Sequence, residues 1–225
     1  MRLLLIVAAL LAGLASLVRH FPLAWAGAAV PENVATLSGT VWNGQAHDLP
    51  LLGTVAVKGV LGGIRLETPP GEVNLSGTIG PGGVDDLVLS MPVARLPTTD
   101  ARLAGLSGRV SLRIDEAEIA DGHCLSATGT AATDVLAVNG GQFGWAGPSL
   151  DGPVDCADGR LRLRLSGTDG GETVSATIIT GLDGVYQTDM RVITGDAAAG
   201  NALSLFGFVP ADDGTFNLSE QGRWR

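Results

Sequence analysis

The sequence predicts an all-β fold, a mainly antiparallel and curved meander sheet, with an N-terminal transmembrane helix and one short C-terminal helix. The chain of 225 residues holds 33 glycines but only 4% aromatic residues, a composition typical of short strands joined by tight turns. Apolar and polar residues alternate in many short segments, and Asp-Gly pairs stand between several of them. With 45% hydrophobic and 16% charged residues, the chain can fold around a core.

The first element is an apolar run from Leu3 to Val18, flanked by Arg2 and Arg19. As a helix this run spans about 24 Å, short of the roughly 30 Å hydrocarbon core of a bilayer. The run can be a membrane anchor if the apolar and interfacial residues that follow it extend the helix. It can also be a signal peptide, because Ala-Trp-Ala at 24–26 is a cleavage pattern. We expect the anchor. The chain then divides into a membrane anchor or signal segment at 1–26 and an exported β-rich domain at 27–225.

Period-two alternation predicts the strands. In 109–114 (RVSLRI) one side of the strand is apolar, and in 160–165 (RLRLRL) three leucines alternate with Arg160, Arg162 and Arg164. We interpret the arginine row as a solvated strand face. Further strands are predicted at 54–60, 63–68, 72–79, 86–91, 125–132, 173–180, 186–194 and 215–222. Hairpin turns are predicted at the Asp-Gly pairs 121–122, 158–159, 169–170, 183–184 and 213–214.

Two further local patterns bear on the fold. Asp196 can cap a helix from Ala197 to Phe206, with Gly207 at its C-terminal end, and 31–34 can form a helical turn or a bend. The block Leu-Ser-Gly recurs at 37–39, 75–77, 106–108 and 165–167. Glycine inside a strand permits a bulge or the close approach of another backbone, so we interpret the block as a recurring bend.

The two cysteines, Cys124 and Cys156, both lie in the exported part. An oxidising compartment favours their pairing, and a disulfide between them would act as a staple. The competing interpretation is a metal site that uses His123 beside Cys124, but C-x-x-C and H-x-x-x-H spacings are missing. We therefore expect a disulfide and no metal.

Charge and motif spacing disfavour nucleic-acid binding and catalysis. The net charge of −9 repels phosphate backbones. Ser107 lies in Gly-Leu-Ser-Gly rather than in the G-x-S-x-G of a serine hydrolase, and Asp115, Glu116 and Glu118 are best explained as a solvated strand end or turn. The glycine-rich stretch 140–144 lacks the spacing of a dinucleotide loop, and no helix is predicted beside it. We expect neither enzymatic activity nor a cofactor.

Several segments in chain order carry a family resemblance. They are the block Gly39, Thr40, Val41, Trp42 and Gly44 after the apolar run, the segment LSGRVSL, the cysteine segments GHCLSATGT and DCADGRLRLRLSG, and the closing GTFNLSEQGRW. Together they resemble the type II secretion system protein N family. The resemblance implies a single-pass inner-membrane protein with a periplasmic β-rich domain, an accessory part of the machine that moves folded proteins across the outer membrane. It implies partners in the inner-membrane platform or the secretin, and no catalytic residues.

Two alternatives stay open on the sequence alone. A curved sheet with small residues on its inner face can form an apolar trough, so a periplasmic lipid-binding or lipid-transfer protein is the second functional interpretation. A sheet edge could also pair with another β domain by strand addition. Trp42 is interpreted first as a core residue with an internally bonded indole, and second as an exposed anchor for a partner.

Overall fold

The structure is a computed structural model that describes residues 22–23, 36–49, 51–96, 105–143, 145, 147–211 and 214–223. Apart from Pro22 and Leu23, the segment predicted as an anchor at 1–26 lies outside these residues, as does the bend predicted at 31–34. Among the helices that are described, none has both the length and the apolar character needed to cross a membrane.

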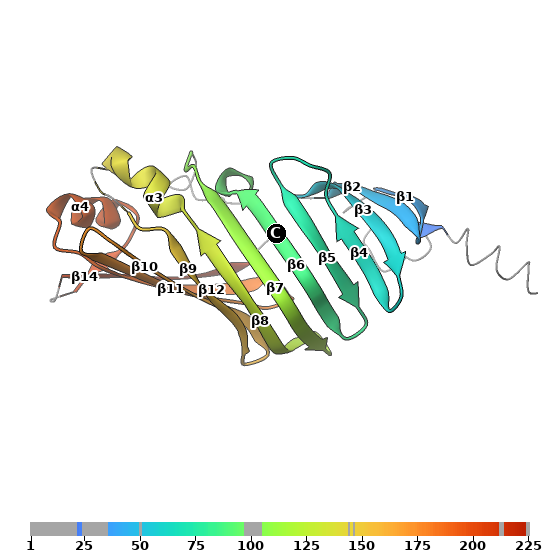
Figure 1. Ribbon diagram of the computed structural model, residues 1–225. Helices are drawn as coiled ribbons and strands as arrows, with labels where there is room; N and C mark the ends of the chain where they lie inside the picture. Colours follow the sequence, from blue (N-terminus) through green and yellow to red (C-terminus); the bar gives the residue numbers. More distant parts are fainter. Residues whose placement is uncertain are drawn as a thin grey trace, which may run out of the picture.

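Fourteen strands of the described residues form one sheet, and every neighbouring pair is antiparallel (Figure 1). The strand order follows the chain except at the C-terminal edge, where β14 lies between β12 and β13. The N-terminal half-sheet consists of β1 (Thr36–Thr40), β2 (Asn43–Leu49), β3 (Gly53–Val60), β4 (Gly63–Glu67), β5 (Asn74–Gly80), β6 (Gly83–Pro92), β7 (Arg109–Ala120) and β8 (His123–Thr133). The C-terminal half-sheet consists of β9 (Leu150–Ala157), β10 (Arg160–Asp169), β11 (Glu172–Thr180), β12 (Val185–Ile193), β13 (Val209–Pro210) and β14 (Thr215–Arg223). The predicted antiparallel meander is confirmed.

Asp-Gly pairs form the tight turns at two of the predicted places. Asp121-Gly122 and Asp158-Gly159 connect consecutive strands, and both residues of each pair have positive φ, between 50° and 76°. Aspartate and glycine tolerate this conformation better than most residues, which explains their choice. Asp183-Gly184 also lies in a hairpin connection, whereas Asp169 still belongs to β10 and its turn is formed by Gly170-Gly171.

Two of the four Leu-Ser-Gly blocks, at 75–77 and 165–167, behave as the predicted bend. At Gly77 the β5–β6 register shifts between Ser76 and Thr78, and a Cβ on Gly77 would lie 2.9 Å from the Leu87 Cα. A Cβ on Gly167 would collide with the carbonyl oxygen of Ser149. Glycine is therefore required where the curved sheet brings backbones unusually close.

The predicted C-terminal helix is present as α4 (Ala197–Leu205). The Asp196 carboxylate accepts a hydrogen bond of 2.7 Å from the backbone N–H of Ala198, which caps the helix. Gly207 follows the helix with φ of 90°, a conformation that favours glycine at a helix end.

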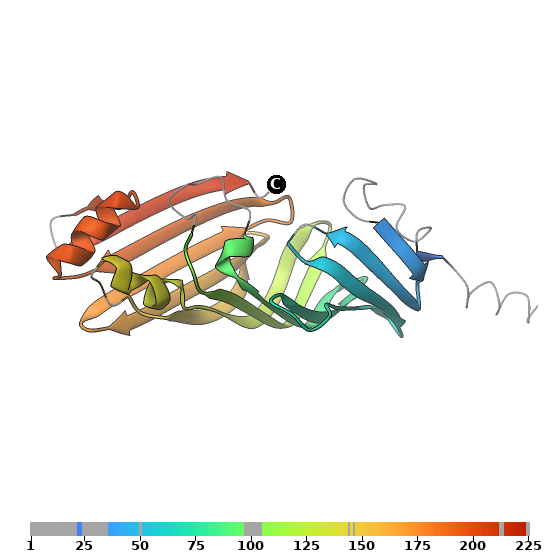
Figure 2. The same ribbon diagram turned by 90° about the horizontal axis from the view of Figure 1, so that it is seen from above.

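A second helix was not predicted. α3 (Val135–Asn139) runs directly into the 3₁₀ turn η3 (Gly140–Phe143), and a further 3₁₀ turn, η2 (Val93–Arg95), follows β6. The expectation that no helix lies beside the glycine-rich stretch is therefore wrong. Every described helix lies in a connection at the same end of the strands (Figures 1 and 2).

The core lies on the inner face of the curled sheet, in two clusters of different size. The larger cluster has eleven buried residues, including Val174 and Val192 of the C-terminal half-sheet and Leu203 of α4. The smaller one has three buried residues, which are Ala46 and Val57 of the N-terminal half-sheet and Leu23, which precedes β1. Helices therefore cover the inner face of one half more fully than that of the other (Figure 2).

Candidate functional site

One apolar row crosses the inner face from strand to strand. Residues directly opposite each other in neighbouring strands share a face, and the ladder registers therefore connect the side chains of this row. We call this row the inner belt; the registers connect Leu75, Leu89, Leu112, Ala131 and Gly152 in β5 to β9, and Leu165, Ala176, Met190 and Leu218 in β10 to β14. The two runs adjoin at a gap in the β9–β10 ladder, where a Cβ on Gly152 would lie 3.3 Å from the Leu165 Cα. The inner belt makes the face under the helices continuously apolar.

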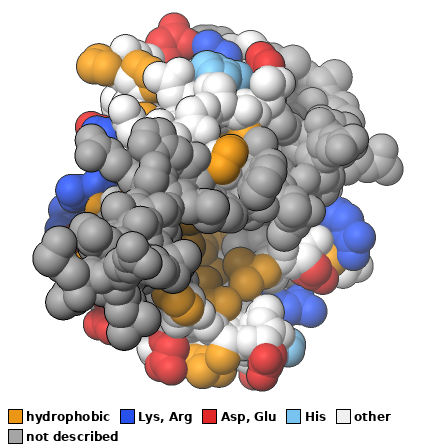
Figure 3. All heavy atoms as spheres, turned by 90° about the vertical axis from the view of Figure 1, so that its right-hand side faces the viewer, with side chains coloured by type: hydrophobic (Ala, Val, Ile, Leu, Met, Phe, Trp, Pro, Cys, Tyr) orange, Lys and Arg blue, Asp and Glu red, His pale blue; other side chains and the backbone are white. Residues whose placement is uncertain are grey.

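A cavity of about 330 Å³ lies between the C-terminal part of the inner belt and the two helices. Its walls come from β8 to β12, from β14, from α3 and α4, and from the connection between β6 and β7. The lining side chains are largely apolar and include Val93, Leu106, Leu136, Trp145, Leu150, Leu165, Ala176, Ile178, Met190, Val192, Leu203, Phe206, Phe208 and Leu218. Seen along the sheet from its β1 end, the molecule has a hollow whose visible interior is hydrophobic (Figure 3).

Asn139 fixes one wall of this cavity. Its side chain is only 4% exposed and accepts a hydrogen bond of 3.0 Å from the Ser107 N–H while donating to the Ser107 carbonyl at 2.7 Å. It also donates to the carbonyl of Val135 within its own helix. These bonds attach the β6–β7 connection to the end of α3, so that two segments far apart in sequence form a single wall.

Trp145 supplies an unsatisfied polar group in the same wall. The side chain is 7% exposed, and its indole Nε1 is buried without a hydrogen-bond acceptor among the described residues. Of the described residues that line the cavity, Glu220 is the only one with an ionisable side chain, and none carries a positive charge. The cavity is therefore suited to an apolar group and offers no cation to an anion.

A buried carboxyl lies next to the start of α4. Glu172 is 7% exposed, and its Oε1 accepts a hydrogen bond of 2.9 Å from the Thr194 hydroxyl, which in turn accepts one from the Asp196 N–H at 3.0 Å. Burial raises the pKa of Glu172; the Thr194 bond opposes this rise and the nearby Asp196 charge adds to it. Its Oε2 has no partner among the described residues.

The block that carried the family resemblance forms the β1–β2 hairpin. Gly39 has φ of 80°, and a Cβ on Gly44 would lie 2.7 Å from the carbonyl oxygen of Thr40. Both glycines are thus required by the tight hairpin. Val41 packs against the smaller core cluster.

Trp42 lies in the turn of this hairpin and is 46% exposed. Its ring covers Gly59 of β3, where a Cβ would lie 2.7 Å from the Trp42 Cε3 atom. The interpretation of Trp42 as a core residue is therefore wrong, because a turn at the tip of an edge hairpin has core on one side only. Two isoleucines further along the N-terminal half-sheet, Ile64 in β4 and Ile79 in β5, are also 39% and 44% exposed.

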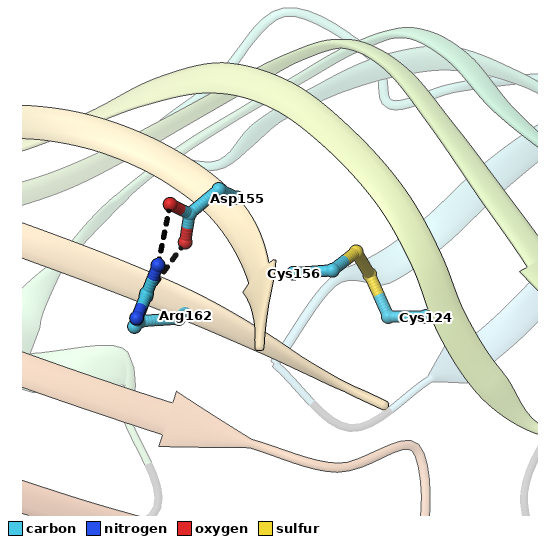
Figure 4. Close-up of a disulfide and its surroundings, with 4 residues drawn as sticks. All are labelled: Cys124, Asp155, Cys156 and Arg162. Atoms are coloured by element: carbon cyan, nitrogen blue, oxygen red, sulfur yellow. Dashed lines mark hydrogen bonds and ion pairs between the residues drawn. A yellow bond between two sulfur atoms is a disulfide. The ribbon is translucent and has the colours of Figure 1, made fainter. Parts of the chain in front are cut away.

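Cys124 and Cys156 are joined by a disulfide with a Cα–Cα distance of 5.7 Å (Figure 4). The regular ladder between β8 and β9 ends at Gly129 opposite Val154. The disulfide connects the two strands beyond that point, and it therefore joins the N-terminal to the C-terminal half-sheet.

The predicted arginine row is partly engaged in ion pairs next to this junction. Arg162 donates to both carboxylate oxygens of Asp155 at 2.8 Å (Figure 4), and Arg164 donates to Asp155 at 2.9 Å. The Arg162 hydrogen bonds lower the pKa of Asp155 despite its partial burial. The expectation of a merely solvated face is thus too simple for two of the three arginines.

The structure also places the side chains weighed as catalytic or metal-binding candidates. Ser107 lies at the cavity wall through its bonds to Asn139. Asp115 pairs with Arg113 at 2.8 Å on the exposed face of β7. Within the described ranges, no group of three or more His, Cys, Asp or Glu side chains is arranged to hold a metal ion.

No sequence pattern points directly to Asn139 or Trp145. The signals that were available are an amide at the end of the apolar stretch 135–138 and a tryptophan between small residues in GWAG. Neither pattern is specific to a cavity, because both depend on how the long connections pack onto the sheet.

Comparison with known protein families identifies the family of the chain. A family model described as "Type II secretion system (T2SS), protein N" matches residues 33–219. The matched part includes the β1–β2 hairpin, the disulfide, α3 and α4. No curated protein and no solved structure gives a significant match.

Proposed function

Because the chain belongs to the type II secretion system protein N family, we propose that it is an accessory component of the type II secretion pathway. In this role it supports the export of folded proteins across the outer membrane by contacts with other secretion components. Its N-terminal apolar run anchors it in the inner membrane by a single pass, and its β-rich domain lies in the periplasm. The family match over residues 33–219 is the observation that carries this proposal.

The disulfide supports a periplasmic location. Structural disulfides persist in oxidising compartments such as the bacterial periplasm and are rare in the cytosol. Cys124 and Cys156 are also the only cysteines of the chain, so the pairing leaves no thiol for another role. The apolar run from Leu3 to Val18 supplies a segment that can direct the following domain across the inner membrane.

The two edges of the sheet support a role in protein–protein contact. β1 forms one edge, and in the described part of the chain only a single bridge, from Thr40 to Pro22, lies on its outer side. At the other edge β13 pairs with β14 only at Phe216 and Asn217. An edge strand with free backbone groups can accept a strand from another protein. The platform or the secretin is the partner that we propose for such an edge.

A chromosomal deletion tests the proposed role. We expect the deletion to lower the secreted amount of a folded substrate and to leave the permeability of the outer membrane to a large antibiotic unchanged. Complementation with the full chain should restore secretion. Normal secretion in the deletion strain, with the machine intact, would contradict the proposal.

Site-specific photo-crosslinking tests the edges in the living cell. A photoreactive residue at Ser38 in β1 or at Gln221 in β14 is expected to capture a platform component or the secretin. Thr130 in β8 is the matched control, because it is also exposed but belongs to a strand that is paired on both sides. Equal capture from all three positions would argue against edge pairing as the mode of contact.

A further inference from the structure

We propose that the cavity under α3 and α4 binds one acyl chain of a zwitterionic or neutral ester lipid, with the rest of the lipid lying along the inner belt. This inference does not depend on the secretion role. It rests on the size of the cavity, the continuity of the inner belt, the charges around it and one unsatisfied indole N–H.

The size of the cavity fits part of an acyl chain. Its volume of about 330 Å³ falls within the roughly 300–1,000 Å³ of typical ligand pockets. A water occupies roughly 30 Å³ in the liquid, and since a methylene is of similar size, the cavity takes about ten methylenes. The site is too small for a complete phospholipid, and its largely apolar lining does not suit a polar ligand.

The inner belt is long enough to hold the part of the lipid that lies outside the cavity. From Leu75 in β5 to Gly152 in β9 the belt crosses five strands, and at about 4.8 Å between strands this distance is about 19 Å. An acyl chain reaches roughly 15 Å, half of a 30 Å hydrocarbon core. Ile64 and Ile79, exposed by 39% and 44%, lie on neighbouring strands of the N-terminal half-sheet. A lipid lying there would remove such apolar surface from water.

The charges favour a lipid without net negative charge. Glu220 is the only ionisable group among the described residues that line the cavity, and the chain as a whole carries a net charge of −9. A free fatty acid or an anionic head group would meet repulsion and find no cation in the cavity wall. A zwitterionic head group such as phosphoethanolamine avoids this cost.

Trp145 gives the ester group a partner. Its indole Nε1 is buried without an acceptor among the described residues, although buried donors are normally hydrogen-bonded. The ester carbonyl of a lipid is an acceptor that carries no charge. A lipid oxygen carried into the cavity next to Trp145 can therefore satisfy a donor that the protein leaves unpaired.

The test uses the full chain, purified in a mild detergent and mixed with phosphatidylethanolamine that carries a diazirine in one acyl chain. After irradiation, the labelled peptides are identified by mass spectrometry. We expect adducts on cavity residues such as Ile178 and Leu218. Unlabelled phosphatidylethanolamine should displace the probe at least several-fold better than phosphatidylglycerol does.

Two matched variants separate the cavity from the rest of the surface. Thr188→Trp fills the cavity from β12, whereas Gln187→Trp places the same ring on the opposite face of the same strand. Labelling should fall at least tenfold in T188W and stay unchanged in Q187W. Thermal unfolding of both variants without lipid shows that they fold.

Trp145→Phe tests the hydrogen bond, because it keeps an aromatic ring and removes the indole N–H. We expect about three- to tenfold weaker binding of the probe, the range of one hydrogen bond. Adducts spread evenly over both faces, equal labelling of T188W and Q187W, or a bound peptide in place of a lipid would each overturn the proposal. Unchanged binding of the probe by W145F would contradict the proposed hydrogen bond between Trp145 and the ester.

Discussion

The two halves of the sheet are built from similar strands but end in different surroundings. At the C-terminal half-sheet, α3 and α4 cover an inner face with a cluster of eleven buried residues, of which one, Ala131, belongs to the adjoining strand β8. At the N-terminal half-sheet the cluster has only three buried residues, one of which, Leu23, precedes β1, while Ile64 and Ile79 remain 39% and 44% exposed. The difference arises from the connections, because the helices of the C-terminal half fold back onto the sheet. The C-terminal half is therefore expected to provide most of the stability, and the N-terminal half to leave apolar surface for contacts.

Removing the disulfide should have a large effect, because it breaks the covalent link between the two halves. Cys124→Ser is expected to lower the free energy of unfolding by about 3–4 kcal/mol, through the entropy of the unfolded chain. The double variant with Cys156→Ser should lose the same amount, since either change removes the single bridge. Chemical denaturation of the oxidised protein measures the loss. Two free thiols in the unreduced wild type would contradict the disulfide itself.

Truncating one apolar residue in each half tests the comparison directly. Leu203→Ala in α4, where the side chain is 3% exposed, should cost about 2–5 kcal/mol. Ile79→Ala in β5, where the side chain is 44% exposed, should cost less than about 1 kcal/mol. Equal losses in thermal or chemical unfolding would show that the two halves contribute alike.

Much of this architecture could be predicted from the sequence, because strand alternation and turn chemistry are local. Asp196 and Gly207 mark the ends of α4, and Asp121-Gly122 marks a hairpin, without knowledge of the rest of the fold. The strands at 36–49 were not predicted, since glycine and polar residues interrupt their alternation. β9 was also not predicted. Its Pro153, which has no backbone N–H, lies at a gap in the β9–β10 ladder, between the pairs at Val154 and Asp151.

The candidate site was less accessible to prediction, because the cavity is a property of tertiary packing. Strand periodicity shows which residues share a face, but it does not show which part of that face a helix will cover. α3 is only five residues long, and the bonds from Asn139 attach it to Ser107 in the β6–β7 connection, 32 residues away in the sequence. Such a contact leaves no local pattern. The apolar trough could be suggested from curvature, but not the position of its closed part.

The stability that the C-terminal half provides should depend on pH, because this half contains the buried carboxyl group of Glu172. Glu172→Gln is expected to stabilise the protein at pH 7 by on the order of 1 kcal/mol. Burial raises the folded-state pKa of Glu172 above its usual 4.5, so the wild type loses stability as the pH rises from about 4.5 through the raised pKa. The advantage of the variant should therefore disappear near pH 4. Unfolding curves across this range measure the effect, and the exposed Glu118→Gln serves as the matched control.

The smallest expected effect concerns ion pairs. Like the core residues, the paired side chains compared here are less exposed in the C-terminal half than in the N-terminal half. Asp155 is 28% exposed and bonds Arg162 through both oxygens at 2.8 Å, whereas Lys58 and Glu67 in the N-terminal half lie 3.5 Å apart and are about half exposed. Asp155→Asn should cost no more than about 1 kcal/mol, and Glu67→Gln should change nothing measurable, because exposed pairs are screened by water. Arg162 lowers the folded-state pKa of Asp155 below its usual 3.8, so this stabilisation is complete above about pH 4 and is lost as the pH falls through the lowered pKa. Unfolding at pH 7 and at pH 2.5 measures both variants. A loss for E67Q as large as that for D155N would mean that the exposed N-terminal half depends on its surface charges as much as the covered half does.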